Sequence, residues 1–175
     1  MSGWFLAGIV TATSGVPLDV CQRAGAYGGG LTFVTCSGAP LNGAAPDTGV
    51  FGGVAGSGGV GTSADPAAGG TGLNMFADPQ AAYRAFRYIQ LAQDDRAGRG
   101  TLRGLSRWNL DLSIGKKIPI TGNVRGVFSA EILNLFNTVQ FNNGSLNFAT
   151  PSTFGVITGQ GNTPRQIQLG FRLEF

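Results

Sequence analysis

The sequence predicts an all-β fold, an antiparallel meander of about four long strands. Three observations predict it. The segment 165–175 alternates strictly between apolar and polar residues, three other segments have strand length, and the stretches between them are rich in glycine. Alternation with a period of two places the apolar side chains on one face of a strand and the polar side chains on the other.

The first strand is expected at about residues 4–13, within the segment 1–20. Trp4, Leu6 and Val10 share one parity, but Phe5 and Ile9 occupy the other. Because both faces are apolar, the orientation of this strand stays open at this point.

The other strands are expected at about residues 105–116, 124–135 and 165–175. Each has an apolar parity and a more polar one, although Val127 and Leu133 fall on the polar parity of the strand at 124–135. The principal residues of the apolar parity are Trp108, Leu110, Leu112, Phe128, Ile167, Leu169, Phe171 and Leu173. The charged residues of the polar parity are Arg107, Asp111, Arg125, Glu131, Arg172 and Glu174.

The connections between these strands are very long, short and long. Residues 21–104 form a glycine-rich connection, Gly122 and Asn123 mark a short turn, and residues 137–164 form a second long loop. Within the first connection, Asp78 is a good N-cap and Pro79 suits the first helical position, which predicts a short helix at about 79–93.

Strand length and composition favour a membrane. A tilted strand of about 9–11 residues crosses a bilayer. Charged residues make up 12% of the chain, about half the usual share. Irregular stretches this long are uncommon in compact soluble domains, whereas barrels in the outer membrane have short periplasmic turns and long extracellular loops. The sequence therefore predicts an open segment of a transmembrane β-barrel, with long extracellular loops and with Phe175 on the periplasmic side.

Several function classes have little support in the composition. The net charge is +3 with scattered basic residues, so no nucleic-acid surface is expected. The chain has no histidine, and we expect neither catalysis nor a metal or cofactor site. The segment 56–61 matches G-x-G-x-x-G, but low-complexity sequence surrounds it, which favours a loop over a nucleotide site.

Cys21 and Cys36 lie close in sequence. In an oxidising compartment they could form a disulfide that stabilises the fold by up to about 3 kcal/mol. Two free thiols are the alternative.

Several runs resemble TonB-dependent outer-membrane receptors, in particular the Oar-like branch. The resemblance covers about residues 98–175 specifically, residues 2–20 moderately and the long connection only loosely. The runs that carry it are Gly98–Gly104, Trp108–Ser113 with Lys116, Ala130–Asn137 with Gln140 and Phe141, Phe154 and Gly155, Pro164–Leu169, and the terminal Phe175.

This resemblance implies an outer-membrane protein of a Gram-negative-type bacterium that imports a large, scarce solute, such as a metal chelate or an oligosaccharide. The family has a 22-stranded barrel with an N-terminal plug and is powered by TonB. Because this chain holds only about four strands and no plug, we expect it to be a C-terminal fragment. Its expected partners are membrane lipid, the remaining strands and plug of the parent receptor, TonB through that plug, and the barrel-assembly machinery, which would recognise Phe175.

In such a barrel the charged parity would face the lumen and the apolar parity would face lipid. Two alternatives stay open. One is a homotrimeric barrel with four strands from each chain, and the other is a soluble, glycine-rich β-sandwich adhesin.

Overall fold

The computed structural model describes residues 3–22, 37–88, 90 and 99–175, which form two compact units. The strand unit comprises Met1–Thr13, Ser106–Gln140 and Gln160–Phe175. The loop unit comprises Ser14–Leu105 and Phe141–Gly159. The two long connections between the strands therefore make up the loop unit.

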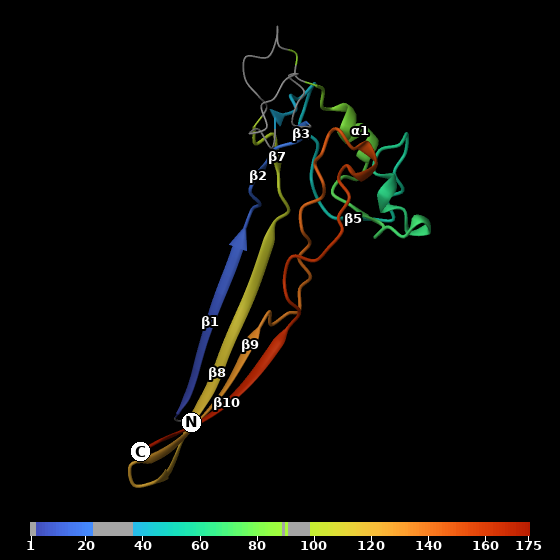
Figure 1. Cartoon of the computed structure of the whole chain (residues 1–175). Coiled ribbons are helices and arrows are strands. Elements are labelled where there is room, and N and C mark those ends of the chain that lie inside the picture. Colours follow the sequence, from blue (N-terminus) through green and yellow to red (C-terminus); the bar gives the residue numbers. More distant parts are fainter. Residues whose placement is uncertain (1–2, 23–36, 89, 91–98) are drawn as a thin grey trace, which may run out of the picture. The chain divides into compact units, whose positions relative to one another are not determined.

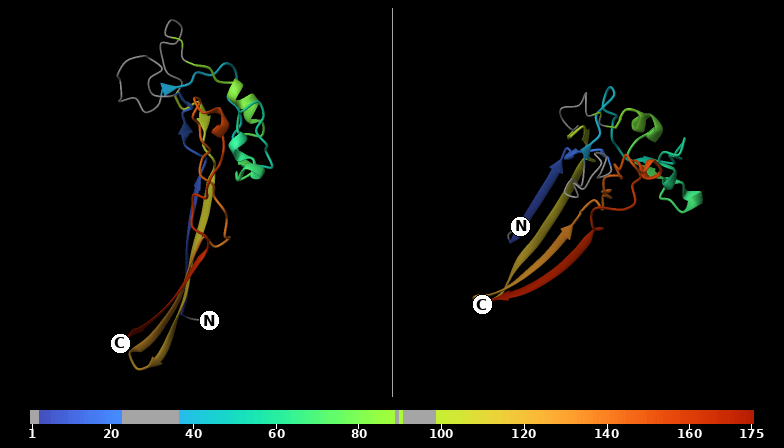
Figure 2. Two further views of the ribbon diagram at one scale, coloured as in Figure 1. Left: turned by 45° about the vertical axis from the view of Figure 1, so that its right-hand side comes forward. Right: turned by 45° about the horizontal axis from the view of Figure 1, so that its top comes forward.

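The strand unit is one antiparallel sheet with the strand order β1-β8-β9-β10. Its strands are β1 (Trp4–Thr13), β8 (Arg107–Thr121), β9 (Val124–Leu133) and β10 (Gln166–Glu174). All views show the four strands side by side in this order (Figures 1 and 2). The predicted all-β fold with an antiparallel sheet of four long strands is confirmed.

The register of the sheet separates its two ends. Gly122 and Asn123 form the β8–β9 turn at one end. Both long connections leave from the other end, where Thr13 is opposite Arg107 and Leu133 is opposite Gln166. The C-terminus of β10 lies at the turn end of the sheet (Figure 1).

Strand β8 differs from its predicted bounds at both ends. It continues to Thr121 instead of ending at Lys116, because the register shift between Pro119 and Thr121 accommodates a proline within the hairpin. It begins at Arg107 because Leu105 is buried in the loop unit instead.

Among its described residues, the loop unit contains three short antiparallel strand pairs, β2–β7, β3–β4 and β5–β6. These strands are β2 (Pro17–Leu18), β3 (Cys21–Gln22), β4 (Ser37–Gly38), β5 (Phe51–Gly52), β6 (Leu73–Asn74) and β7 (Leu102–Arg103). Bridges also join the two long connections, with Asn74 opposite Val156 and Cys21 opposite Asn147. The two connections remain mostly loop in the described residues, but they fold together, which the sequence did not indicate.

A buried aromatic core explains why these connections fold together. Phe154 is fully buried, and its ring lies 5.4 Å from that of Phe76, 5.2 Å from that of Tyr83 and 6.3 Å from that of Phe86. Asn74, also fully buried, donates from Nδ2 to the Phe154 carbonyl at 3.1 Å and accepts from the Phe76 N–H at 2.9 Å. Burial of these rings away from water offsets the entropy lost on ordering a glycine-rich chain.

One glycine in this core has no substitute. Gly155 has φ of 74°, in the left-handed region, and a Cβ at this position would overlap Oδ1 of Asn74. Its carbonyl accepts a hydrogen bond from the Met75 N–H at 2.7 Å. Glycine is therefore required where the second connection crosses the first.

The predicted helix exists but is shorter than expected. Helix α1 (Pro79–Arg84) begins as predicted, because Oδ1 of Asp78 accepts from the Ala81 N–H at 2.9 Å. The predicted end at Gln93 is wrong, since the helix stops at Arg84 and Phe86 then bridges to Leu41. Phe86 is 4% exposed and packs in the core just after the helix ends.

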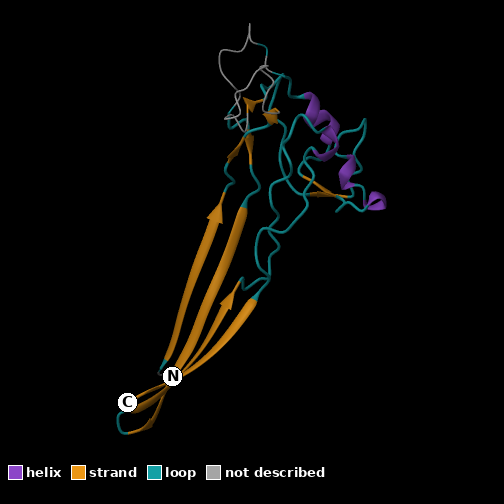
Figure 3. Ribbon diagram, viewed as in Figure 1, coloured by secondary structure: helices purple, strands orange, loops and turns teal. Residues whose placement is uncertain are grey.

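The other helical segments of the described residues are the single 3₁₀ turns η1 (Thr62–Ala64), η2 (Pro66–Ala68) and η3 (Pro151–Thr153). Helical segments are purple in Figure 3. The segment 56–61 forms a tight turn at Gly58 and Gly59, followed by η1. It therefore lacks the strand–loop–helix context of a dinucleotide site. No helix in the described part of the chain has the length and apolar character needed to cross a membrane.

Candidate functional site

The sheet of the strand unit has one face covered with apolar side chains, here called the apolar face. Cross-strand pairing places Phe128 opposite Phe171, and Ile132 opposite both Leu112 and Ile167. The eight residues of the predicted apolar parity all lie on this face, namely Trp108, Leu110, Leu112, Phe128, Ile167, Leu169, Phe171 and Leu173. Register fixes this arrangement because a shift of one residue would move the whole set to the opposite face.

Pairing with β8 also resolves the orientation of β1, which the sequence left open. Trp4 is opposite Lys116, Leu6 is opposite Ile114, and Val10 is opposite Leu110. These three side chains of β1 therefore extend the apolar face. Leu6 is 69% exposed and Val10 is 71% exposed, so a large apolar surface lies open along β1.

The opposite face, here called the polar face, carries the predicted charged residues. They are Arg107, Asp111, Arg125, Glu131, Arg172 and Glu174. Lys117, one residue beyond the predicted end of its strand, also lies on this face. The structure thus brings all six predicted residues to one side of the sheet.

A charged cluster on the polar face lies near the turn end. The Arg172 guanidinium donates to Oε1 of Glu174, and Nζ of Lys117 lies 3.9 Å from Oε2 of Glu174. Arg125 is directly opposite Glu174 in the register. Val127 lies between Lys117 and Arg172 and is only 8% exposed, so the long cationic side chains shield it.

Asp111 takes part in a separate polar junction, at the end from which the long connections leave. Its Oδ1 accepts from the Asn134 N–H at 2.8 Å and from Nδ2 of Asn109 at 2.7 Å. Asn134 is 5% exposed and has φ of 55°, so β9 ends at Leu133 and not at the predicted Leu135. The junction therefore turns the chain out of the sheet.

The Asn134 side chain fixes the two segments that follow. Its Nδ2 donates to the carbonyls of Thr138 (3.1 Å) and Thr163 (3.2 Å), and its Oδ1 accepts from the Thr138 N–H at 3.0 Å. The sequence analysis did not single out Asn134. The available signal was an asparagine directly after a strand, where left-handed backbone is needed.

We expect Asn134→Ala to destabilise the strand unit by about 2–4 kcal/mol, because the variant loses buried hydrogen bonds and places a Cβ on left-handed backbone. Asn134→Gly keeps the backbone geometry and is expected to cost less. Urea titration of refolded protein measures both, with the exposed Thr11→Ala as the control. Equal stability of Asn134→Ala and the parent chain would contradict this role.

In the loop unit, Tyr83 of the first long connection contacts Phe148 of the second. Its hydroxyl donates to the Phe148 carbonyl at 2.8 Å, and the two rings stack with centroids 4.3 Å apart. Burial, and then the neighbouring Tyr88, raise the pKa of Tyr83 above its ordinary value. The hydroxyl therefore remains a hydrogen-bond donor at neutral pH.

The remaining predicted residues have no site geometry around them. Phe175 follows β10 and is 97% exposed, which leaves it accessible for recognition. Cys21 lies in β3, whereas Cys36 lies outside the described residues, so their disulfide stays a prediction. The described residues contain no group of three or more histidine, cysteine, aspartate or glutamate side chains placed to hold a metal ion.

Comparison with known proteins gives a match to a protein family. The sequence profile of a family described as an outer membrane beta barrel domain matches residues 1–168. No curated protein and no solved structure matches the chain. The matched region includes β1, β8, β9 and the first residues of β10, together with the whole loop unit.

Proposed function

Because the chain belongs to the outer membrane beta barrel domain family, we propose that its sheet forms part of the wall of a TonB-dependent receptor, which imports a large, scarce solute. The protein is located in the outer membrane, and its four-stranded antiparallel sheet is a segment of a β-barrel. The solute would be a metal chelate or an oligosaccharide.

The two faces of the sheet carry the proposal. The apolar face faces lipid, where Leu169 (79% exposed) meets acyl chains instead of water. The polar face, with its charged residues, faces the lumen, because a basic residue facing lipid at the midplane costs about 2–4 kcal/mol. In a complete receptor, the charged cluster around Glu174 would lie where the plug packs against the wall.

The ends of the sheet give its direction in the membrane. Barrels of this kind have short turns in the periplasm and long loops outside. The Gly122–Asn123 turn and Phe175 would then lie in the periplasm, and the loop unit would be extracellular. The loop unit is therefore the part that first contacts the solute, and Phe175 the part that the assembly machinery recognises.

The receptor assignment has further support in the runs that resemble TonB-dependent receptors. Asn134 and Asn137 both have positive φ, and Gly155 lies where the two long connections cross. These are positions where the backbone restricts the residue type. The resemblance therefore rests on residues with structural roles and not on composition alone.

The two outer strands of the sheet can each pair with a further strand. In the described part of the chain, β1 pairs only with β8 and β10 only with β9, so each has an open edge. The remaining wall of the receptor would close them. A homotrimer of four-stranded protomers would close them too, and chemical cross-linking to a trimeric species would favour that second candidate. A soluble sandwich does not agree with the outer-membrane location.

Energised uptake tests the proposed function. We expect cells that produce the complete barrel to accumulate an iron-labelled ferric hydroxamate chelate or a fluorescent oligosaccharide above its external concentration. Accumulation should stop when a protonophore collapses the energy supply of TonB. Passive equilibration of both probes, unchanged by the protonophore, would contradict a TonB-dependent receptor.

A further inference from the structure

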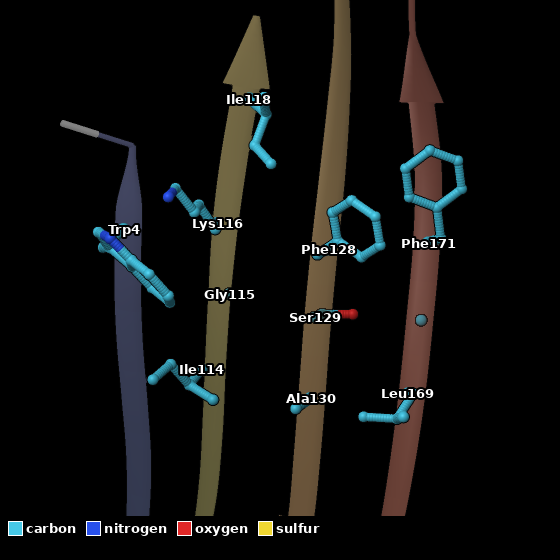
Figure 4. A pocket seen from close by; sticks show the side chains of 11 residues that line it. Trp4, Ile114, Gly115, Lys116, Ile118, Phe128, Ser129, Ala130, Leu169 and Phe171 are labelled. Atoms are coloured by element: carbon cyan, nitrogen blue, oxygen red, sulfur yellow. The ribbon is translucent and has the colours of Figure 1, made fainter.

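Asparagine followed by glycine, a dipeptide prone to spontaneous deamidation, occurs twice in this chain. The two pairs are Asn42–Gly43 and Asn143–Gly144, and both lie in the loop unit. The sequence of the strand unit contains no such pair. There the hollow of the apolar face is lined mainly by hydrocarbon and aromatic groups (Figure 4). The loop unit is therefore where this chemistry is possible.

Deamidation needs one close approach within the dipeptide. The backbone nitrogen of the glycine loses its proton and attacks Cγ of the asparagine, ammonia leaves, and a succinimide ring closes. Water then opens the ring at either carbonyl and gives aspartate or isoaspartate, so no oxidant or further reactant is needed. Glycine favours the attack because it has no Cβ to obstruct it and its backbone rotates freely. The rate in a folded protein therefore depends on how freely the side chain and this nitrogen can meet.

Asn42 can make this approach in the folded chain. Its side chain is exposed, and neither that side chain nor the Gly43 N–H forms a hydrogen bond within the described part of the chain. Gly43 is exposed as well, and a Cβ placed on it would have no heavy atom within 4 Å. The attack can therefore proceed without breaking a contact of the loop unit.

Asn143 is restrained by its surroundings. Its Oδ1 accepts a hydrogen bond from the Leu105 N–H at 2.9 Å, and Gly144 is buried. A Cβ on Gly144 would overlap the carbonyl oxygen of Gly155, so the two backbones are in close contact. The Asn143 side chain must break its hydrogen bond before Cγ can turn toward the Gly144 nitrogen. The fold thus opposes the same reaction that it permits at Asn42.

We propose that Asn42 is a site of spontaneous deamidation in the folded protein, whereas Asn143, in the same kind of dipeptide, is protected by the fold. The reaction adds a negative charge to the loop unit at position 42, five residues before Asp47. The proposal does not depend on the proposed function, because it rests only on the contacts within the loop unit.

The loop unit should keep its fold after the reaction. The Asn42 N–H donates to the Ala85 carbonyl at 2.7 Å, and the Gly49 N–H donates to the Met75 carbonyl at 3.0 Å. Isoaspartate adds one backbone atom between these two hydrogen bonds. Residues 43–47, which lie there, form no backbone hydrogen bond within the described part of the chain. The added atom therefore needs no change in the buried core.

Mass spectrometry of the aged protein tests the proposal. The full chain, folded into vesicles and checked by heat-modifiable migration, is incubated at mildly alkaline pH, and digestion in heavy-oxygen water marks any deamidation that occurs during digestion. We expect Asn42 to deamidate about tenfold faster than Asn143, the factor expected when a hydrogen bond must break before a reaction. The chain unfolded in urea is the matched control, and there the two rates should be about equal.

Two variants and one stability measurement complete the test. Gly43→Ala should slow the reaction at Asn42 because the new Cβ obstructs the attack. Asn42→Gln should nearly abolish it, since the longer side chain would have to close a larger ring. Neither variant should change the rate at Asn143. Protein aged until Asn42 is modified should resist limited proteolysis of its loop unit as well as fresh protein does.

Three results would overturn the proposal. Equal rates at Asn42 and Asn143 in the folded chain would show that the fold does not distinguish the two pairs. Reaction of Asn42 only in urea would show that the fold protects this residue too. Faster proteolysis of the aged protein would contradict the retained fold of the loop unit. All three results would leave the receptor assignment unaffected.

Discussion

Leu169→Arg is expected to destabilise the membrane-inserted protein by about 2–4 kcal/mol, which corresponds to roughly a 30- to 1,000-fold loss of the folded state. Leu169 lies in the middle of β10, opposite Ala130, and is 79% exposed on the apolar face. A guanidinium at this position would face acyl chains at the greatest distance from either headgroup region. Urea titration of protein folded into vesicles, read by heat-modifiable migration, measures the loss.

Gln168→Arg is the matched control. Gln168 is the preceding residue of the same strand and lies opposite Glu131 on the polar face. The same charge introduced there should change stability by less than about 0.5 kcal/mol, or stabilise slightly through the carboxylate. Equal costs for the two variants would show that the faces are assigned wrongly or that the sheet does not cross the membrane.

Phe154→Ala is expected to destabilise the loop unit by about 3–5 kcal/mol, the usual cost of deleting a buried phenylalanine. Phe154 is fully buried and contacts the rings of Phe76, Tyr83 and Phe86. Its loss would open the crossing between the two long connections. Limited proteolysis of intact vesicles should then cleave the loop unit much faster than in the parent chain.

Phe136→Ala provides the comparison for this core variant. Phe136 is 60% exposed and belongs to the strand unit, so its removal should leave the proteolysis of the loop unit unchanged. In Phe154→Ala, the protected fragments from the strand unit should persist. A loop unit that stays protease-resistant without Phe154 would mean that the aromatic core does not hold it together.

The strands and their faces could be predicted because alternation is a local signal. In β10, each residue from Gln166 to Glu174 shows its side of the sheet by parity alone. Strand β1 carried no such signal, since Phe5 and Ile9 are as apolar as Leu6. Only its pairing with β8, a contact across about a hundred residues, assigns its faces.

The loop unit could not be predicted because its stabilising contacts join distant residues. Phe154 packs against Phe76, and Tyr83 packs against Phe148, with no periodic pattern around any of them. The glycine-rich sequence between these aromatics indicated only the absence of regular strands and helices. The low periodicity of the two connections therefore gave no indication that they fold together.

The candidate site was predictable in part for the same reason. Parity found the charged residues of the polar face, but it could not show that Glu174 pairs with Lys117 on a strand that extends past its predicted end.

Spin-label scanning of β8 tests most directly whether this sheet crosses the membrane. Nitroxides would be placed singly from Trp108 to Ser113, in a background in which both cysteines are replaced by serine, with the protein folded into vesicles. Labels at 108, 110 and 112 should collide mainly with oxygen dissolved in lipid, and labels at 109, 111 and 113 mainly with a water-soluble nickel chelate. Equal access of the nickel chelate to all six positions would contradict a membrane-spanning sheet with one face toward lipid.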